Sequence, residues 1–282
     1  MTGDKKAGRL LVVGTPIGNL DDMSPRAARA LAQADAILCE DTRVTGKLAA
    51  RFNLTAPRIS CPAPREKARA ADLLRRLSQG QTVALVTDAG MPALSDPGEH
   101  LVETAARAGF SVLVVPGPSA PAAALAVSGL PAIPHVFLGF LPARPGHRQR
   151  FLESLRGREE TLVWFEAPHR LVDSLADAAR VLGPRRAAVA RELTKLHEET
   201  LRGPLDELAL AFQARGSGRG EITVVVEGAG GAAPPGAVDI DEEIRAGLAS
   251  GLSKRKAARQ IAAKSGRPAN EIYARMVAMS KG

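Results

Sequence analysis

Several residue types and motifs are scarce in this 282-residue chain, and each absence narrows what it can be. Aromatic side chains make up only 3% of the residues, so the core must be mostly aliphatic. Two cysteines, Cys39 and Cys61, are too few for a disulfide framework and fit a reducing compartment. No apolar run approaches the roughly 18 residues of a membrane span, and the first residues show no apolar signal-peptide core. We therefore expect a cytoplasmic protein.

The usual motifs for phosphates, metals and hydrolytic chemistry are also absent. The loop GTPIGN (14–19) follows an apolar run, where a nucleotide-binding protein would carry a glycine-rich loop, but it lacks the G-x-G-x-x-G spacing. No Walker-type loop and no G-x-S-x-G occur. The five histidines show no ligand spacing, and the cysteines form no C-x-x-C pair, so no metal site is predicted.

What the chain does contain is an alternation of short β-branched runs with longer helical patterns. Unalternating apolar runs are typical of strands buried on both faces of a parallel sheet. Ser24-Pro25 is a favourable helix start, with a serine cap followed by proline. The expected strands are 9–13, 35–39, 82–86 and 111–115. The first expected helix starts at Ser24-Pro25, and the others cover 46–52, 65–78, 99–108 and 119–128. This order predicts an α/β layered domain.

The second half keeps the alternation with more strands per helix, which predicts a second α/β domain with a mixed sheet. Its expected strands are 160–167, 185–194, 197–203 and 220–228, and its expected helices lie near 147–156, 168–182 and 204–213. Gly/Pro-rich residues then predict a linker, and helical spacing of apolar residues predicts three short helices beyond it. The predicted divisions are 1–130, 131–228, the linker 229–239 and a basic helical module 240–282.

Glycine, proline and charged residues gather in six segments, each directly after an expected strand. In α/β sheets, ligand sites form beyond the carboxyl ends of the strands. Six such loops predict a composite pocket, although glycine and proline alone often serve only backbone geometry. The six segments are GTPIGN (14–19), EDTRVTG (40–46), TDAGMPALSDPGEH (87–100), PGPSAPAAAL (116–125), FEAPHR (165–170) and RELTK (191–195).

Taken together and in order, these motifs resemble one family. TPIGNL, CEDTR, TDAGMPALSDPG, VPGPSA, GFLP, FEAPHR, ARELTK and GEITVVVEG resemble the ribosomal RNA small subunit methyltransferase I family, from about Arg9 to Gly228. The C-terminal section resembles the helical module of the same family. The resemblance implies two α/β domains of the tetrapyrrole methylase (class III methyltransferase) type. It also implies a homodimer and S-adenosylmethionine-dependent methylation of a cytidine ribose 2′-hydroxyl in 16S rRNA of the small (30S) ribosomal subunit.

The resemblance also assigns residues to the cofactor. Adenine needs apolar walls and backbone hydrogen-bonding groups, and the turn GPSA that opens a helix offers N–H groups to a carboxylate. Met91 stands where the family commonly carries threonine and offers no hydroxyl, so at this position we expect only the backbone contacts to the cofactor to persist. The assigned residues are Pro16, Ile17, Asp88, Gly90, Met91, Leu94, Ser119, Ala120, Phe165, Leu193, Ile222 and Thr223.

Charged loop residues are the candidates for the reacting end of the substrate. A ribose hydroxyl has a high pKa, so a general base or strong orientation should help, while in-line positioning against the sulfonium supplies much of the rate. Our candidates are Asp41, Arg43, Glu192 and Lys195. Sequence leaves open which of them, if any, takes the proton, and ion-paired loop anchoring is the alternative role.

The positive charge, a formal net charge of +8, clusters in two places. Cations that contact phosphates dominate RNA affinity. We predict RNA contacts from Arg144, Arg148 and Arg150 after GFLP, and from Lys254, Arg255, Lys256 and Arg259 in the C-terminal module. Two other functions stay open at this stage: a methyltransferase of the same fold acting on a small molecule, and a non-catalytic RNA-binding protein. The basic module disfavours the first and the intact loop set disfavours the second.

Overall fold

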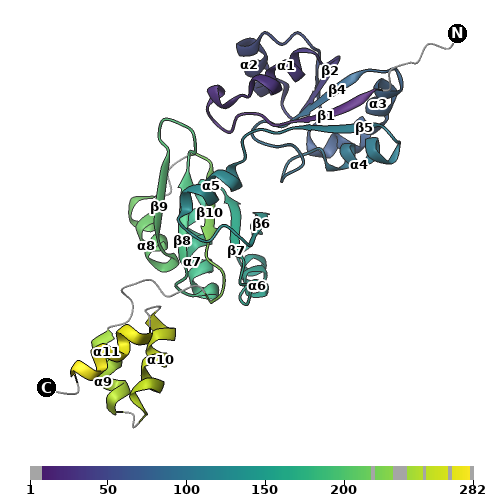
Figure 1. Ribbon diagram of the computed structural model, residues 1–282. Helices are drawn as coiled ribbons and strands as arrows, with labels where there is room; N and C mark the ends of the chain where they lie inside the picture. The colour runs from purple at the N-terminus through teal and green to yellow at the C-terminus, as the bar shows by residue number, and fades with distance from the viewer. Residues whose placement is uncertain (1–7, 217–219, 231–239, 250–251, 266–268, 280–282) are drawn as a thin grey trace. The chain divides into compact units, whose positions relative to one another are not determined.

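A computed structural model describes residues 8–216, 220–230, 240–249, 252–265 and 269–279 (Figure 1). The chain divides into two compact units. The first holds Met1–Val127, Ala190–Thr200 and Gly220–Thr223, and the second holds Ser128–Val189, Leu201–Arg219 and Val224–Gly282. The predicted boundaries at 131 and 228 stay predictions. Most of the predicted linker, 231–239, lies outside the described residues.

The first sheet has five parallel strands in the order β3-β2-β4-β1-β5. Their bounds are β1 Arg9–Val13, β2 Ala36–Cys39, β3 Arg58–Ser60, β4 Thr82–Val86 and β5 Ser111–Val115. Four of the five strands follow the sequence prediction closely. The edge strand β3 was missed, because three residues are too short to show a periodic signal.

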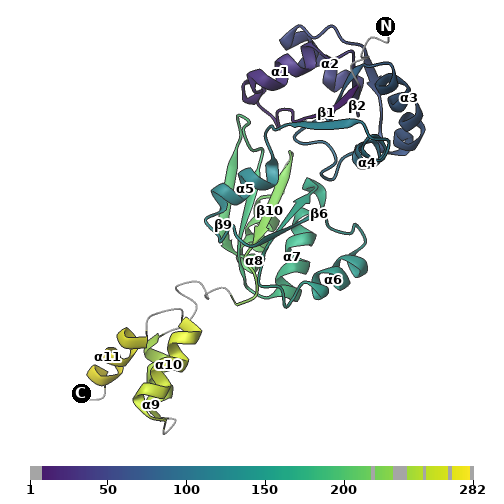
Figure 2. The same ribbon diagram turned by 45° about the vertical axis from the view of Figure 1, so that its right-hand side comes forward.

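Helices cover both faces of this sheet, which makes three layers (Figure 2). On one face α1 (Pro25–Ala32) and α2 (Thr42–Phe52) pack through Ala27, Leu31 and Leu48. On the other face α3 (Glu66–Ser78) and α4 (Glu99–Arg107) pack through apolar side chains such as Leu73 and Leu101. The alternation of side chains along buried strands, with both faces apolar, dictates this arrangement. The helix α5 (Ala120–Ser128) follows β5.

Two caps set where the first helices begin. The hydroxyl of Ser24 accepts a hydrogen bond from the backbone N–H of Ala27 at 3.0 Å, with Pro25 at the first helical position, as predicted. The carboxylate of Asp41 accepts from the backbone N–H of Arg43 at 2.8 Å. Because Asp41 caps it, α2 begins at Thr42, four residues before the predicted start.

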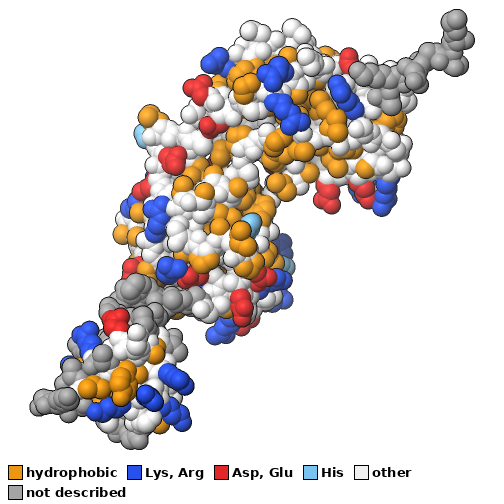
Figure 3. Space-filling view, in the orientation of Figure 1, with side chains coloured by type: hydrophobic (Ala, Val, Ile, Leu, Met, Phe, Trp, Pro, Cys, Tyr) orange, Lys and Arg blue, Asp and Glu red, His pale blue; other side chains and the backbone are white. Residues whose placement is uncertain are grey.

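The strand β5 departs from the prediction that strands are buried on both faces. Leu113 and Val114 are 43% and 55% exposed. As an edge strand, β5 has one neighbour, β1, so its side chains are not enclosed as those of the central strands are. Figure 3 shows hydrophobic side chains on the surface over this strand.

The second sheet has the order β6-β7-β10-β8-β9. Its strands are β6 His135–Phe140, β7 Thr161–Glu166, β8 Arg186–Arg191, β9 Glu199–Pro204 and β10 Ile222–Val226. The helix α7 (Leu171–Leu182) packs against α6 (Pro145–Ser154) and α8 (Leu205–Arg215). Trp164 and Phe212 are fully buried. The strand β6 was not predicted, since prolines and Gly139 interrupt its pattern.

The C-terminal module contains α9 (Ile240–Ala249), α10 (Lys254–Ser265) and α11 (Ala269–Met279). The prediction of three helices is confirmed. Their contact surface is a small apolar core made by Ile244, Ala257, Ala258, Ile261, Ile272 and Met276. Among the residues that the structure describes, no helix has the length and apolar character that crossing a membrane requires.

Candidate active site

The carboxyl ends of β1 and β4 are tied together by a reciprocal backbone bridge. The N–H of Thr15 donates to the carbonyl of Gly90 at 2.9 Å, and the N–H of Gly90 donates to the carbonyl of Thr15 at 3.2 Å. The buried Thr15 hydroxyl also donates to the carbonyl of Thr87, at 3.2 Å. The loop GTPIGN is thus held to TDAGMP by main-chain and side-chain bonds.

Close backbone approach explains two glycines at this sheet edge. A Cβ atom on Gly14 would lie 2.6 Å from the nitrogen of Gly117 and 2.6 Å from the sulfur of Met91. A Cβ on Gly117 would meet the backbone of Gly14 at 2.7 Å. Any side chain at either position would therefore separate the loops after β1 and β5. The Met91 side chain fills the space beside Gly14.

Among the residues assigned to the cofactor, those in the loops after β1, β4 and β5 lie at this edge. Pro16 and Ile17 are buried, Met91, Ser119 and Ala120 are partly buried, and Asp88 and Leu94 are exposed. Gly90 has φ +81°, and a Cβ there would meet only Ile17 and the Pro118 carbonyl, at 3.4 and 3.7 Å. Leu193, Ile222 and Thr223 are buried in the same unit. Phe165 lies in the second unit, at the end of β7.

A group of carboxylates surrounds the buried hydroxyl of Thr87. That hydroxyl donates to Glu40 at 3.3 Å and also hydrogen-bonds Asp96. Burial raises the pKa of Asp96 to about 6, the Thr87 hydrogen bond opposes the rise, and the carboxylates of Glu40 and Asp88 add to it. Burial likewise raises the pKa values of Glu40 and Asp88. Asp96 is therefore the carboxyl of this group suited to exchanging a proton near pH 6.

Asp41 and Arg43 form a different arrangement in the neighbouring loop. Arg43 Nε lies 3.1 Å from each carboxylate oxygen of Asp41, and Arg43 Nη2 lies 2.6 Å from Oδ2. The hydrogen bonds from Arg43 hold the pKa of Asp41 at about 2. The N–H of Asp41 donates to Asp88 at 3.1 Å. Asp41 is therefore an anionic anchor and a poor proton acceptor, while Arg43, with its side chain 88% exposed, faces solvent.

The RELTK loop packs against GTPIGN through a lysine. A Cβ on Gly18 would lie 2.5 Å from Cγ of Lys195 and 3.1 Å from the carbonyl of Leu193, so the lysine stem crosses this glycine. The Lys195 ammonium donates to Glu192 at 2.9 Å and to Glu221 at 3.2 Å. The ion pair lowers the pKa of Glu192, and the two carboxylates raise the pKa of Lys195 against the opposing effect of burial. Neither side chain is suited to proton abstraction.

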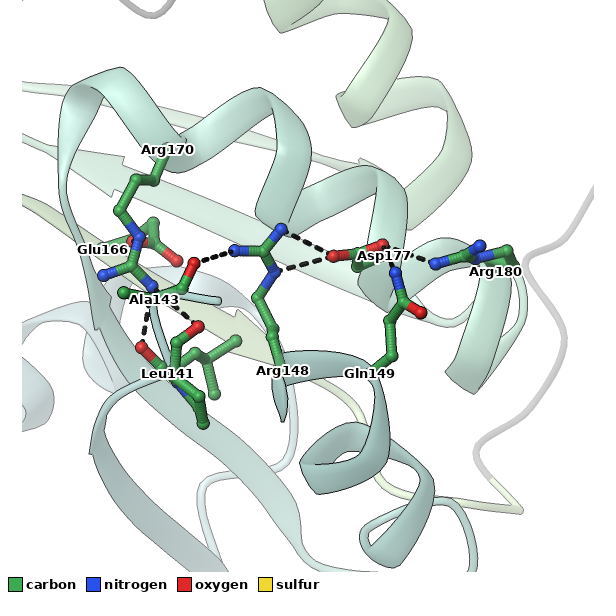
Figure 4. A network of polar contacts seen from close by, with 9 residues as sticks. Leu141, Ala143, Arg148, Gln149, Glu166, Arg170, Asp177 and Arg180 are labelled. Carbon is green, nitrogen blue, oxygen red and sulfur yellow. Dashed lines mark hydrogen bonds and ion pairs between the residues drawn. The ribbon is translucent and has the colours of Figure 1, made fainter. Parts of the chain in front are cut away.

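The predicted RNA contacts do not all reach the surface. Arg144 and Arg150 are exposed, as are Lys254, Arg255, Lys256 and Arg259 on α10. Arg148 is 2% exposed, and its Nε and Nη2 lie 2.7 and 2.6 Å from Oδ2 of Asp177 (Figure 4). The prediction for Arg148 is wrong, because α6 turns this position inward and α7 supplies a carboxylate for it. A buried, paired guanidinium is unavailable to a phosphate.

Sequence reasoning left three participants out of the predicted site. Thr15 and Thr87 are buried polar residues that bond the loops, and Asp96 carries the shifted carboxyl. The TDAGMPALSDPG motif contains Asp96, but the motif does not show that the side chain returns to Thr87. In the described part of the chain, no group of three or more His, Cys, Asp or Glu side chains is arranged to hold a metal ion.

Comparison with known proteins defines the class of this fold and site. Residues 9–209 match the family model of the tetrapyrrole (corrin/porphyrin) methylases. A solved cobalt precorrin-4 methyltransferase covers 78% of this chain and 94% of its own, with 20% identity and a TM-score of 0.59. A diphthine synthase structure covers 78% and 90%, with 14% identity and a TM-score of 0.59. The chain belongs to the tetrapyrrole methylase family, and the predicted two-domain α/β fold is confirmed.

Closer relatives define the branch within that family. A protein named ribosomal RNA small subunit methyltransferase I from Synechocystis is 42% identical over 94% of this chain and 96% of its own length. A protein of the same name from Mycobacterium tuberculosis is 48% identical over 79% of each chain. One from Thermotoga maritima is 45% identical over 78% of this chain and 99% of its own. The chain is thus a member of the ribosomal RNA small subunit methyltransferase I family, and S-adenosylmethionine is the cofactor of this class.

Proposed function

We propose that this protein transfers the methyl group of S-adenosylmethionine to the ribose 2′-hydroxyl of a cytidine in 16S rRNA of the 30S subunit, acting in the cytoplasm as a homodimer. The observation that carries the proposal is the identity of 42% with a protein of that name over 94% of the chain. The division 1–130, 131–228 and 240–282 is part of the same proposal, with the helical module docking RNA.

The residues that the family resemblance assigns to the cofactor fit it chemically. Ile17, Leu193 and Ile222 are apolar walls of the kind that an adenosyl group requires. Ser119 and Ala120 stand at the start of α5, where backbone N–H groups attract a carboxylate. The cofactor, when bound, supplies a methyl group on a sulfonium. GTPIGN needs no phosphate-binding glycines for such a ligand, and its glycines serve close packing instead.

The pKa shifts of the candidates for the substrate end of the site all favour the charged forms of these side chains. Asp41 and Glu192 have lowered pKa values and Lys195 a raised one, so we propose that these residues and Arg43 orient the substrate. The hydroxyl proton passes to a carboxylate of raised pKa, and we assign this role to Asp96, whose pKa is about 6. An acceptor near the working pH is the more effective one.

The test is methyl transfer from labelled S-adenosylmethionine to 30S subunits that lack the modification. We expect label in 16S rRNA and one new position resistant to alkaline cleavage, because a methylated 2′-oxygen cannot attack the adjacent phosphate. Label at a position that alkali still cleaves would indicate methylation of the base and not of the ribose. Absence of label in rRNA, with cofactor binding intact, would refute the proposed function.

A further inference from the structure

Three phenylalanine side chains of the second unit pack together on neighbouring strands. Only seven phenylalanines occur in the chain, yet three of them meet at the ends of β6 and β7. The ring centroids of Phe137 and Phe165 are 4.9 Å apart in an edge-to-face arrangement, and those of Phe140 and Phe165 are 5.5 Å apart. Phe140 is 56% exposed. A protein with few aromatic residues therefore carries an exposed phenylalanine within a cluster of three.

A backbone irregularity aims Phe140 at this cluster. Residues three apart on a regular strand point to opposite faces, so Phe137 and Phe140 should not share a neighbour. The pairing of β6 with β7 shifts register between these two residues, and Gly139 has φ +65°. Such bulges re-aim a side chain. The bulge brings both phenylalanines against Phe165.

The segment after Phe140 is fixed by the buried Arg148 and the partly buried Arg170 (Figure 4). Arg170 Nη2 donates to the carbonyls of Leu141 and Pro142 at 2.7 and 3.2 Å. Arg148 Nη1 donates to the carbonyl of Ala143 at 3.3 Å. Three successive carbonyls are therefore held from the α6 and α7 side. The exposed ring stands on an ordered support, which lowers the entropic cost of binding a flat ligand.

Positively charged side chains follow the ring along the chain. Arg144 and Arg150 come within ten residues and are exposed. Figure 3 shows hydrophobic side chains gathered over β6 with Lys and Arg side chains over the neighbouring α6. An exposed ring beside cations matches an unpaired nucleotide, whose base stacks and whose phosphate is attracted. Contact with a second copy of the protein would instead require a broader apolar surface without these cations.

We propose that Phe140 is a stacking platform for an unpaired base of the RNA substrate, with Arg144 and Arg150 holding the adjoining phosphates. The inference rests on the proposed function and specifies how the substrate is recognised. Phe165, the residue that the family resemblance assigns to the cofactor, supports Phe140 directly.

The test compares Phe140→Ala and Phe140→Trp with Leu210→Ala, which removes a side chain 65% exposed on α8. Base stacking on an aromatic side chain corresponds to roughly 5- to 150-fold in affinity. We expect the KM for 30S subunits to rise about tenfold or more in Phe140→Ala, with S-adenosylmethionine affinity unchanged. Phe140→Trp should stay within about twofold of the unsubstituted protein, as should Leu210→Ala.

Three outcomes decide against the proposal. An unchanged KM in Phe140→Ala, with methylation by the unsubstituted protein intact, overturns the stacking role alone. If Phe140→Ala dissociates an oligomer in sedimentation velocity, the ring forms a contact between copies of the protein instead. Failure of the unsubstituted protein to methylate 16S rRNA overturns the proposed function and this inference with it. Near-ultraviolet and fluorescence spectra establish that each variant is folded.

Discussion

The two basic clusters of this chain have the same appearance in sequence and different surroundings in the fold. In α6, Arg148 is enclosed, with its guanidinium on Asp177 and on the carbonyl of Ala143. In α10, the neighbouring cations Lys254, Arg255 and Lys256 are exposed. The difference shows that the partner, and not the residue type, decides whether a cation supports the fold or is available to a ligand.

The buried arginine belongs to a hydrogen-bond network centred on Asp177. Oδ1 of Asp177 accepts from Gln149 at 2.9 Å and from Arg180 at 2.6 Å, so both oxygens of this carboxylate are bonded. Breaking such a pair leaves an uncompensated buried charge. Exposed cations carry no such penalty, and salt screens their interactions.

The largest effect is expected for Arg148→Ala. Loss of the guanidinium leaves Asp177 without its main partner, which should lower the free energy of unfolding of the second unit by about 3–5 kcal/mol. Urea titration followed by fluorescence of Trp164, the only tryptophan in the chain, measures it. Arg144→Ala, four residues away and exposed, should change stability by less than about 0.5 kcal/mol. Equal losses in the two variants would contradict the contrast.

An intermediate effect is expected from reversing the charges of α10. The triple change Lys254→Glu, Arg255→Glu and Lys256→Glu should weaken 30S binding roughly tenfold or more at moderate salt. The slope of log affinity against log salt should fall by about 2, since each contact to single-stranded RNA contributes about 0.7. Filter binding at several salt concentrations measures both quantities.

A matched control separates specific contacts from net charge. The same change at Lys47, Arg65 and Lys67, exposed residues of the first unit, alters the charge equally. If both triple variants lose affinity to the same extent, then α10 has no special role and total charge governs binding.

The smallest effect on stability is expected at Asp96, whose pKa is set by burial, Thr87 and neighbouring carboxylates. Its pKa is raised from 3.8 to about 6 in the folded protein, so folding favours the protonated form. The protein therefore loses stability as pH rises from about 4 to 6, and the cost is complete at pH 7 and above. Asp96→Asn should be more stable than the unsubstituted protein at pH 7.5, by at most about 1–2 kcal/mol.

Thermal unfolding of the Asp96→Asn variant between pH 4 and 8 measures the difference, which should vanish near pH 4. Asp72→Asn is the control of opposite sign, because hydrogen bonds from Arg76 and Arg75 lower the pKa of Asp72 despite its burial. A constant offset for Asp96→Asn at every pH would mean that the carboxyl does not titrate in this range.

Local pattern was sufficient for most of the first sheet. The apolar runs at 9–13 and 82–86 became β1 and β4 with the predicted bounds, and Ser24-Pro25 opened α1. The missed strands have clear causes, since β3 is three residues long and β6 contains a bulge at Gly139. The exposed face of β5 could not be predicted, because a run of apolar residues indicates a strand but not its position in the sheet.

The order of the motifs by itself determined the family of this protein, and the apolar runs determined its strands, because both signals lie in short continuous segments. Only the tertiary structure decided that Arg148 meets Asp177, 29 residues away, and that Thr87 stands between Glu40 and Asp96. It also decided that Phe140 joins Phe165. Such pairings depend on which helix face turns inward and on strand register, and these are set by packing of the whole sheet rather than by local periodicity.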